Sequence, residues 1–401
     1  MHIPTPELTA LEDILPTEPL LMMGAGPVPI PEPVAKANSI VINHLGDTMA
    51  KIIEQVKQMS RYVFQTNSKW IMGVAGPGSA AMEMAITNLI WQDTKVLSIT
   101  NGFFSGRLAE MARRVGANVE VFSVPEQQIA NLDALKQTIE IFKPEVITLV
   151  QGETSNTVCN KNLEEVAKLA HNYGCYVIVD AVCTLSTMPL QMDEWNIDAV
   201  ITGGQKGLSS IPGVSLIAFS ERAYQRIHSR EKDCPQWCLD ARLAEKFWHQ
   251  SSYHYTAPVS GILAIHEALA LICKETLENR FARHQRCSLA LQRGIEALGL
   301  KLFVPEAARL NSVIGIEVPN GIAQKALCQH ISNRYRVEIA GSFGLNIVRI
   351  GQMGEQSRAH HLFRTLHAFG CAIRDLGGDI DLPTGMAELE RGLQAQYSDN
   401  F

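Results

Sequence analysis

The sequence predicts an α/β protein with a mostly parallel, seven-stranded sheet covered by helices on both faces, followed by a smaller C-terminal α+β domain. Three observations lead to this prediction. At 401 residues the chain is long enough for two domains. Apolar, strand-like runs alternate with helix-period segments from about residue 70 to 220, which is typical of a parallel sheet buried on both faces. From about residue 258 the pattern changes to longer helices and shorter strands.

Seven apolar runs are expected to form the sheet of the larger domain. In chain order they are WIMGVA, KVLSIT, NVEVFSV, EVITLV, CYVIVD, AVITG and VSLIAF. Helical stretches near 78–90, 104–115, 131–142 and 161–173 separate the first five. VSLIAF follows AVITG after a short loop, and a parallel pair needs a longer crossover, so this strand is expected to run against the others. Ligands of such sheets bind at the carboxyl ends of the strands.

The C-terminal part is expected to form the smaller domain. A long helix over roughly 259–297 would link the domains, followed by strands near 301–303, 312–317 and 346–350 and helices near 322–333 and 355–376. We therefore divide the chain into an N-terminal segment (1–20), a large domain (21–258), a small domain (259–385) and a flexible tail (386–401). The N-terminal segment should pack against one of the domains or against a partner subunit.

Composition excludes several classes of partner. The net charge is −6 and no basic tract is present, which argues against nucleic acid or an anionic membrane. The apolar stretch SGILAIHEALALIC is too short to span a bilayer, and the N-terminus lacks the features of a signal peptide. The nine cysteines are scattered, and the one close pair, Cys234 and Cys238, has no second pair or nearby histidine at metal-binding spacing. We expect no metal, reduced thiols and a cytoplasmic protein.

A lysine and an aspartate are the most informative pair of residues. Lys206 lies in GGQKGLSSIPG, directly after a predicted strand, and Asp180 is the only charge in the run CYVIVDAV. A lysine at the end of a buried strand can form a Schiff base with a carbonyl cofactor. An aspartate at a neighbouring strand end can hold the protonated ring nitrogen of pyridoxal phosphate. The alternatives are a solvated lysine and a helix-capping aspartate.

The segment IMGVAGPGSAAMEMAI predicts a strand, a glycine-rich turn and a helix. Gly76, Gly78, Ser79 and Ala80 lie at the turn and helix start, where free N–H groups and the helix dipole suit a phosphate. The sequence matches neither the P-loop nor the dinucleotide fingerprint. The alternative is tight packing of a helix on a strand.

Further candidates follow other predicted strands. An aromatic ring at Phe104 can stack on a flat cofactor, although Phe103 or Phe104 can equally fill the core. Thr154 and Ser155, in QGETSNTV, can hydrogen-bond a ring hydroxyl or a phosphate, or form a polar turn. Gln205 is a further candidate for phosphate or ring binding.

The last candidates lie in SYHYTAP and IVRIGQMG. Tyr253 and Thr256 offer hydroxyl groups, and Arg349 lies inside an apolar strand. A guanidinium group there suits a substrate carboxylate, and the alternative is an internal salt bridge.

Taken together, these segments resemble the class V aminotransferases of fold type I, a group of pyridoxal-phosphate enzymes. The resemblance is strongest to the alanine–glyoxylate and serine–glyoxylate branch. It runs from MGAGPVPIP near residue 23 to the helix after Arg349. It rests on the order and spacing of the Gly-rich turn, the aromatic-bearing turn, GETS, VDAV, GGQK, YHYT and RIG.

The resemblance implies a role for each candidate. Lys206 and Asp180 would be catalytic, as the Schiff-base lysine and the partner of the ring nitrogen of pyridoxal 5'-phosphate. The other cofactor-binding residues would be Gly78, Ser79 and Gln205 at the phosphate, Phe104 and Thr154 at the ring, and Tyr253 and Thr256 at the phosphate of the neighbouring subunit's cofactor. Arg349 would bind the substrate carboxylate, and Ala25 and Gly26 would line the substrate pocket.

The implied function is a ping-pong transaminase that moves an amino group from alanine or serine to glyoxylate or pyruvate. It would act as a homodimer with shared active sites, and its partners would be small amino acids and 2-oxo acids. Alternatives are a transaminase acting on 2-aminoethylphosphonate or pyridoxamine, a cysteine desulfurase, and a non-catalytic binding module. Gln205 stands where desulfurases usually have histidine, which ranks that alternative low.

Overall fold

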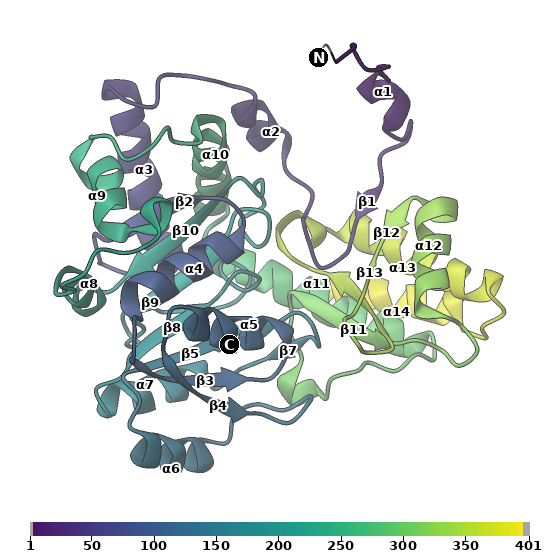
Figure 1. The fold of residues 1–401 in the computed structure, drawn as a ribbon. Helices are drawn as coiled ribbons and strands as arrows, with labels where there is room; N and C mark the ends of the chain where they lie inside the picture. The colour runs from purple at the N-terminus through teal and green to yellow at the C-terminus, as the bar shows by residue number, and fades with distance from the viewer. Residues whose placement is uncertain (1–2, 396–401) are drawn as a thin grey trace.

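The seven predicted strands form one sheet in the computed structural model, which describes residues 3–395 (Figure 1). The strands are β2 (Ile71–Ala75), β3 (Lys95–Thr100), β4 (Asn118–Ser123), β5 (Val146–Val150), β8 (Tyr176–Asp180), β9 (Ala199–Gly203) and β10 (Val214–Phe219). Their order is β2-β10-β9-β8-β5-β3-β4. β10 runs antiparallel to β2 and β9, and the other neighbours are parallel, so the reversed strand is confirmed.

Helices cover both faces of this sheet (Figure 1). They are α2 (Glu32–Asn38), α3 (Asp47–Phe64), α4 (Gly78–Leu89), α5 (Phe103–Arg114), α6 (Leu132–Phe142), α7 (Leu163–Asn172), α8 (Glu221–His228), α9 (Ala241–Gln250) and α10 (Val259–Glu275). Every residue of β5, β9 and β10 is buried, which explains why these strands are continuous apolar runs rather than alternating ones. α4, α5, α6 and α7 confirm the four predicted helical stretches of this region.

A second hydrophobic core belongs to the small domain. Its elements are α11 (Leu277–Ala297), β11 (Val313–Glu317), α12 (Gln324–Tyr335), β12 (Val337–Glu338), β13 (Ala340–Gly341), β14 (Ile347–Gly351), α13 (Ala359–Asp375) and α14 (Leu382–Gln394). β11, β14 and β13 form an antiparallel sheet. The short β1 (Leu21–Met22) pairs with β12, so Leu21 and Met23 contribute to this core although they lie far from it in sequence.

The single long helix expected over 259–297 is wrong. Thr276 has φ 66° and ψ 153°, which ends α10 and starts α11 in a new direction. α10 packs on α2 and α3 within the large domain, whereas α11 packs on α14 and α13. Hydrophobic periodicity continues through the break because both helices are amphipathic, so the pattern alone does not reveal it. The predicted boundary after residue 258 stays a prediction.

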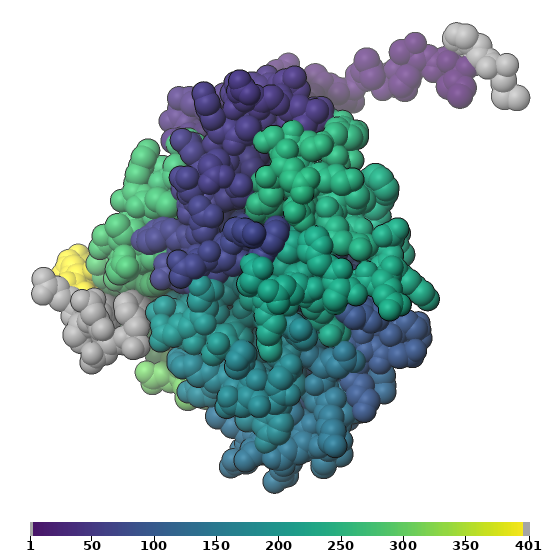
Figure 2. Space-filling view, turned by 90° about the vertical axis from the view of Figure 1, so that its left-hand side faces the viewer, coloured from purple at the N-terminus to yellow at the C-terminus, as the bar shows by residue number. Residues whose placement is uncertain are grey.

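Both chain ends differ from expectation. Residues 386–394, expected in a flexible tail, belong to α14, where Leu389 is fully buried, and residues 396–401 lie outside the described part. Residues 3–19 are exposed and project from the body with α1 (Leu11–Ile14) (Figures 1 and 2). The prediction that this segment packs on one of the protein's own domains is therefore wrong. One contact is present, in which the Arg336 guanidinium donates a hydrogen bond to the Glu18 carbonyl oxygen. Packing on a partner subunit remains a prediction.

Within residues 3–395, no helix combines the length and apolar character needed to cross a membrane.

Candidate active site

Four adjacent strands carry candidate residues to one edge of the sheet. Lys206 follows β9 by three residues, and Asp180 ends β8. Thr154 follows β5 by four residues, and Phe104 is the second residue of α5, after β3. β9, β8, β5 and β3 are consecutive neighbours and parallel. Their carboxyl ends therefore meet, which brings together residues as far apart in sequence as 104 and 206.

The amino group of Lys206 lies in a half-buried position under the turn at Ala25 and Gly26. Nζ donates a hydrogen bond to the Ala25 carbonyl oxygen. Burial lowers the pKa of Lys206 to about 8, and the nearby charge of Arg349 acts in the same direction. Gly26 has φ 96°, and a Cβ added there would lie 2.4 Å from Nζ. Glycine suits the positive φ of this turn, and a larger residue would displace the lysine from its present position.

Asp180 is 7% exposed and accepts a hydrogen bond from the Val182 backbone N–H at 2.8 Å. Burial raises the pKa of Asp180 to about 6, and the negative charge of Glu153 adds to that increase. The positive charges of Arg107 and Lys206 oppose it. Lys206 and Asp180 therefore act on each other electrostatically within one site, as expected for the proposed pair.

The glycine-rich turn forms a cradle at the start of α4. A Cβ on Gly78 would lie 2.8 Å from the Val182 side chain, and a Cβ on Gly203 would lie 3.3 Å from the Gly78 backbone nitrogen. Gln205 reaches the same place, since its Oε1 is 2.9 Å from that Gly203 Cβ position. This oxygen is buried and has no hydrogen-bond partner among the described residues. Ser79 lies in the first turn of α4 beside the cradle.

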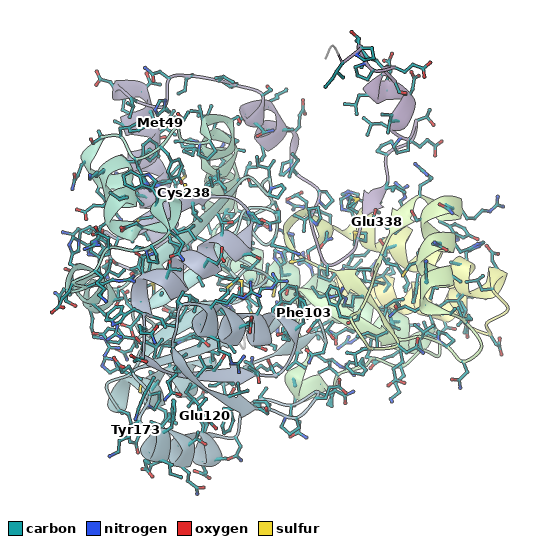
Figure 3. The ribbon with its side chains drawn as sticks, in the orientation of Figure 1. Met49, Phe103, Glu120, Tyr173, Cys238 and Glu338 are labelled. Carbon is teal, nitrogen blue, oxygen red and sulfur yellow. The ribbon has the colours of Figure 1, made fainter. Side chains whose placement is uncertain are left out.

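The two phenylalanines have different surroundings. Phe104 is half-buried and packs against the large core, whereas Phe103 is 48% exposed. Phe103 stacks on Phe343 of the small domain, with ring centroids 4.8 Å apart, at the border of the two domains (Figure 3). The core-filling alternative is therefore wrong for Phe103.

A buried carboxylate fixes the helix that carries Phe104. Glu153 is fully buried and accepts hydrogen bonds from the backbone N–H groups of Phe104 (3.1 Å) and Ser105 (2.9 Å). It also accepts from the hydroxyl groups of Ser105 (2.9 Å) and Ser155 (2.6 Å). The first N–H groups of α5 have no partner inside the helix, so an acceptor here stabilises its start.

Arg349 makes no ion pair in the described part of the chain, so the internal salt bridge is not observed. Its guanidinium is 6% exposed and binds backbone carbonyls: Nη1 donates to Thr154 at 2.6 Å, and Nε and Nη2 donate to Gly341. Two of the five N–H groups, one each on Nη1 and Nη2, remain for a ligand. Arg349 is thereby held next to the segment that also carries Glu153, whose negative charge acts on it from beyond ion-pair distance.

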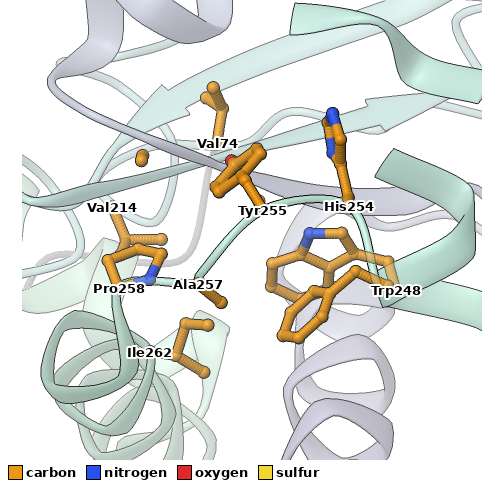
Figure 4. A pocket seen from close by; sticks show the side chains of 11 residues that line it. Val74, Val214, Trp248, His254, Tyr255, Ala257, Pro258 and Ile262 are labelled. Carbon is orange, nitrogen blue, oxygen red and sulfur yellow. The ribbon is translucent and has the colours of Figure 1, made fainter. Parts of the chain in front are cut away.

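Tyr253 and Thr256 lie away from Lys206, on the exposed face of the loop between α9 and α10. His254, Tyr255 and Ala257 of this loop line a small cavity of about 10 Å³ against β2, β10 and α10 (Figure 4). Tyr253 is 57% exposed and Thr256 is also exposed. In the described chain, no hydrogen bond or ring contact joins either side chain to Lys206.

Three residues of this site carried no role in the sequence analysis: Glu153, Val182 and Arg107. Glu153 and Val182 lie inside the quoted motifs GETS and VDAV, one or two residues from candidates, so motif position was an available signal. Arg107 offered only its spacing, one helical turn after Phe104.

These residues fit pyridoxal phosphate. The lysine is half-buried with a lowered pKa, and a buried carboxylate lies on the adjacent strand. Gly78 and Gly203 let the backbone of the cradle lie closer to its neighbours than any Cβ would allow. The Gln205 oxygen that lacks a partner lies at the cradle, and Arg349, which makes no ion pair with the described residues, suits a carboxylate.

Known proteins are similar to this chain in sequence and in fold. The family model for aminotransferase class-V matches residues 34–350. The alanine–glyoxylate aminotransferase of Drosophila melanogaster is 33% identical over 393 residues, which covers 95% of this chain and 99% of the fly protein. The crystal structure of ureidoglycine–glyoxylate aminotransferase from Bacillus subtilis superposes with a TM-score of 0.92 at 28% identity, covering 95% of this chain and 100% of that chain. The alanine–glyoxylate aminotransferase structure from Nostoc sp. gives 0.87 at 32% identity, covering 90% and 97%.

Proposed function

The chain belongs to the class-V aminotransferase family, and on that premise we propose that it transfers the amino group of alanine or serine to glyoxylate or pyruvate, with pyridoxal phosphate as cofactor. The predicted fold type I architecture and the transaminase class are confirmed by these relatives. The observation that carries the proposal is the pair of Lys206 and Asp180 on adjacent strand ends, each with a pKa displaced by burial.

Pyridoxal phosphate, when bound, supplies an aldehyde and an electron-withdrawing ring through which an amino group passes between two substrates. A pKa of about 8 leaves about one Lys206 amine in ten uncharged at pH 7, against about one in three thousand for an ordinary lysine. An uncharged amine can act as a nucleophile and as the base that moves the proton of the substrate α-carbon. Asp180 provides the negative charge that holds a protonated ring nitrogen.

The substrate carboxylate is assigned to Arg349. Two N–H groups of its guanidinium, one on Nη1 and one on Nη2, remain beside the three that bind backbone carbonyls, and they suit a bidentate grip. Glyoxylate as acceptor is supported by the names of the fly, Bacillus and Nostoc relatives, all of which act with glyoxylate. Ureidoglycine is a second candidate donor. The superposition on the ureidoglycine–glyoxylate aminotransferase of Bacillus subtilis covers 100% of that chain, with a TM-score of 0.92.

We further propose a homodimer with shared sites in the cytosol. Tyr253 and Thr256 are exposed, as residues that reach a neighbouring subunit must be before assembly. Trp237 is 64% exposed, and a large exposed aromatic side chain is typical of interfaces. All nine cysteines are free thiols, which supports a reducing compartment. Subcellular fractionation of the source cells tests the compartment.

The reaction is tested by loading purified protein with pyridoxal phosphate and following its absorbance during single turnovers. Alanine, serine, ureidoglycine, 2-aminoethylphosphonate and pyridoxamine are each offered as donor, and glyoxylate and pyruvate as acceptor. The proposal expects conversion with alanine or serine and return with glyoxylate. The Lys206→Ala protein should bind cofactor without turnover. Conversion by pyridoxamine or 2-aminoethylphosphonate alone would contradict the proposed donor.

Shared sites are tested by complementation. Lys206→Ala and the double variant Tyr253→Ala, Thr256→Ala are each expected to be inactive. In a co-expressed heterodimer, one site would combine an intact lysine with intact Tyr253 and Thr256 from the other chain, so activity should return. If the two residues serve their own chain, every site of the heterodimer stays defective and activity stays absent.

A further inference from the structure

Arg107 lies between the two elements assigned to the cofactor. It is one turn after Phe104 on α5, and its guanidinium carbon is 4.9 Å from the centre of the Phe104 ring. Nη1 donates a hydrogen bond of 2.8 Å to the hydroxyl of Ser79, at the start of α4. A single side chain therefore connects the proposed ring-stacking residue with the proposed phosphate cradle.

The charge of Arg107 has no acidic partner within ion-pair distance among residues 3–395. Two other arginines of the same helix, Arg113 and Arg114, pair with Glu110. Arg107 instead contacts a neutral hydroxyl and the faces of Phe103 and Phe104. Only one of its five N–H groups is used in a hydrogen bond, so four remain for an anion.

The cradle also needs positive charge. The N-terminus of a helix such as α4 contributes the equivalent of about half an elementary charge, whereas a phosphate monoester carries about −1.5 to −2 at pH 7. Pro77 at the N-cap has no N–H to contribute. At least one unit of negative charge therefore remains to be balanced, and a planar guanidinium matches the geometry of phosphate oxygens.

We propose that Arg107 is a binding residue for the phosphate group of the cofactor, supplying the cation that the α4 cradle lacks. This inference rests on the proposed function. The competing role is purely positional: Arg107 would stack on Phe104 and orient the ring without contacting the phosphate.

Two ligands separate these roles. Pyridoxal phosphate and pyridoxal share the ring and the aldehyde and differ in the phosphate. Dissociation constants of both are measured on the apoprotein by tryptophan fluorescence for wild type, Arg107→Met and Arg107→Lys, with Arg114→Met as the matched control on α5. If Arg107 binds phosphate, Arg107→Met weakens pyridoxal phosphate by about tenfold to a hundredfold and leaves pyridoxal within about threefold. Arg107→Lys keeps the charge and restores part of the loss.

Equal weakening of both ligands by Arg107→Met assigns the residue to ring positioning and overturns the proposal, as does no effect on either. If Arg107→Met does not fold, the ratio of the two constants for Arg107→Lys against wild type decides the question, and an unchanged ratio overturns it. Any effect of the Asp180 charge acts on both ligands alike, so it cancels in the ratio of their two dissociation constants. Failure of wild type to bind pyridoxal phosphate or to transaminate refutes the proposed function instead, so the two failures are distinguishable.

Discussion

Replacing Asp180 by asparagine should stabilise the apoprotein while removing its function. Asp180 is 7% exposed, and its carboxylate accepts one hydrogen bond, from the Val182 N–H at 2.8 Å. An asparagine side chain has the same shape, and its carbonyl oxygen can accept that same bond. The substitution therefore removes a buried charge and little else. A residue kept for its chemistry at the expense of stability is common at active sites.

The magnitude follows from the pKa. Burial raises the pKa of Asp180 from 3.8 to about 6. At about 1.36 kcal/mol for each pKa unit, keeping this carboxylate ionised in the folded state costs about 3 kcal/mol. The folded state binds the proton more tightly than the unfolded state, so stability from this group falls as pH rises from about 4 to 6. At pH 7 the whole cost is present, and at pH 4 nearly all of it is absent.

The assay is chemical denaturation of apoprotein at fixed protein concentration, because a dimer's apparent stability depends on concentration. Asp180→Asn should exceed wild type by up to about 3 kcal/mol at pH 7 and approach it near pH 4. Asp379→Asn, at an exposed position, is the control and should change stability by less than about 0.5 kcal/mol. In the presence of pyridoxal phosphate the difference should shrink or reverse, because wild type binds the cofactor more tightly and gains more stabilisation from it. An apo Asp180→Asn protein no more stable than wild type at pH 7 would refute the reasoning.

Three other substitutions test the remaining geometry. Arg349→Ala should raise the KM for the amino donor by the equivalent of about 2–4 kcal/mol. Steady-state kinetics measures this effect, with Arg349→Lys for comparison. An unchanged KM would mean that the substrate carboxylate binds elsewhere. Gly26→Ala puts a Cβ 2.4 Å from the present position of the Lys206 nitrogen, at a residue with φ 96°. Cofactor attachment, measured by absorbance after borohydride reduction, should fall sharply, and the free energy of unfolding should fall as well because alanine is strained at this φ. Normal attachment would contradict the contact. Glu153→Ala leaves the backbone N–H groups of Phe104 and Ser105 without an acceptor, so the free energy of unfolding should fall by about 3 kcal/mol or more. A loss below about 1 kcal/mol would show that water replaces the carboxylate.

Local patterns were sufficient for most of the large domain. The seven apolar runs became seven strands. A strand buried on both faces, such as β5 or β9, must be apolar throughout, whereas the partly exposed edge strand β4 alternates. Asp180 and Lys206 could be selected because a charge that ends or follows a buried strand is costly unless it has a use.

Other features depended on distant contacts. α10 ends and α11 begins at Thr276 because the two helices pack into two separate hydrophobic cores. A local residue pattern does not show which core a helical face will contact. The last helix, α14, was missed because its stability comes largely from packing on α11. Glu153 and Arg107 were missed for the same reason: their partners lie 48 and 28 residues away in sequence.

The sequence by itself determined the order of the strands along the chain, the reversal of the last one, and the residue types from which a pyridoxal-phosphate site can be built. Tertiary structure alone decided which strands are neighbours, and hence that the lysine and the aspartate lie at the same edge of the sheet. It also decided that Arg349 is held by carbonyl groups rather than by an acid, and that a fully buried carboxylate anchors α5. The physical reason is range. Turn geometry and burial pattern depend on a few consecutive residues, whereas the displaced pKa values and the pairing of charges depend on segments that are distant in sequence and meet only in the folded chain.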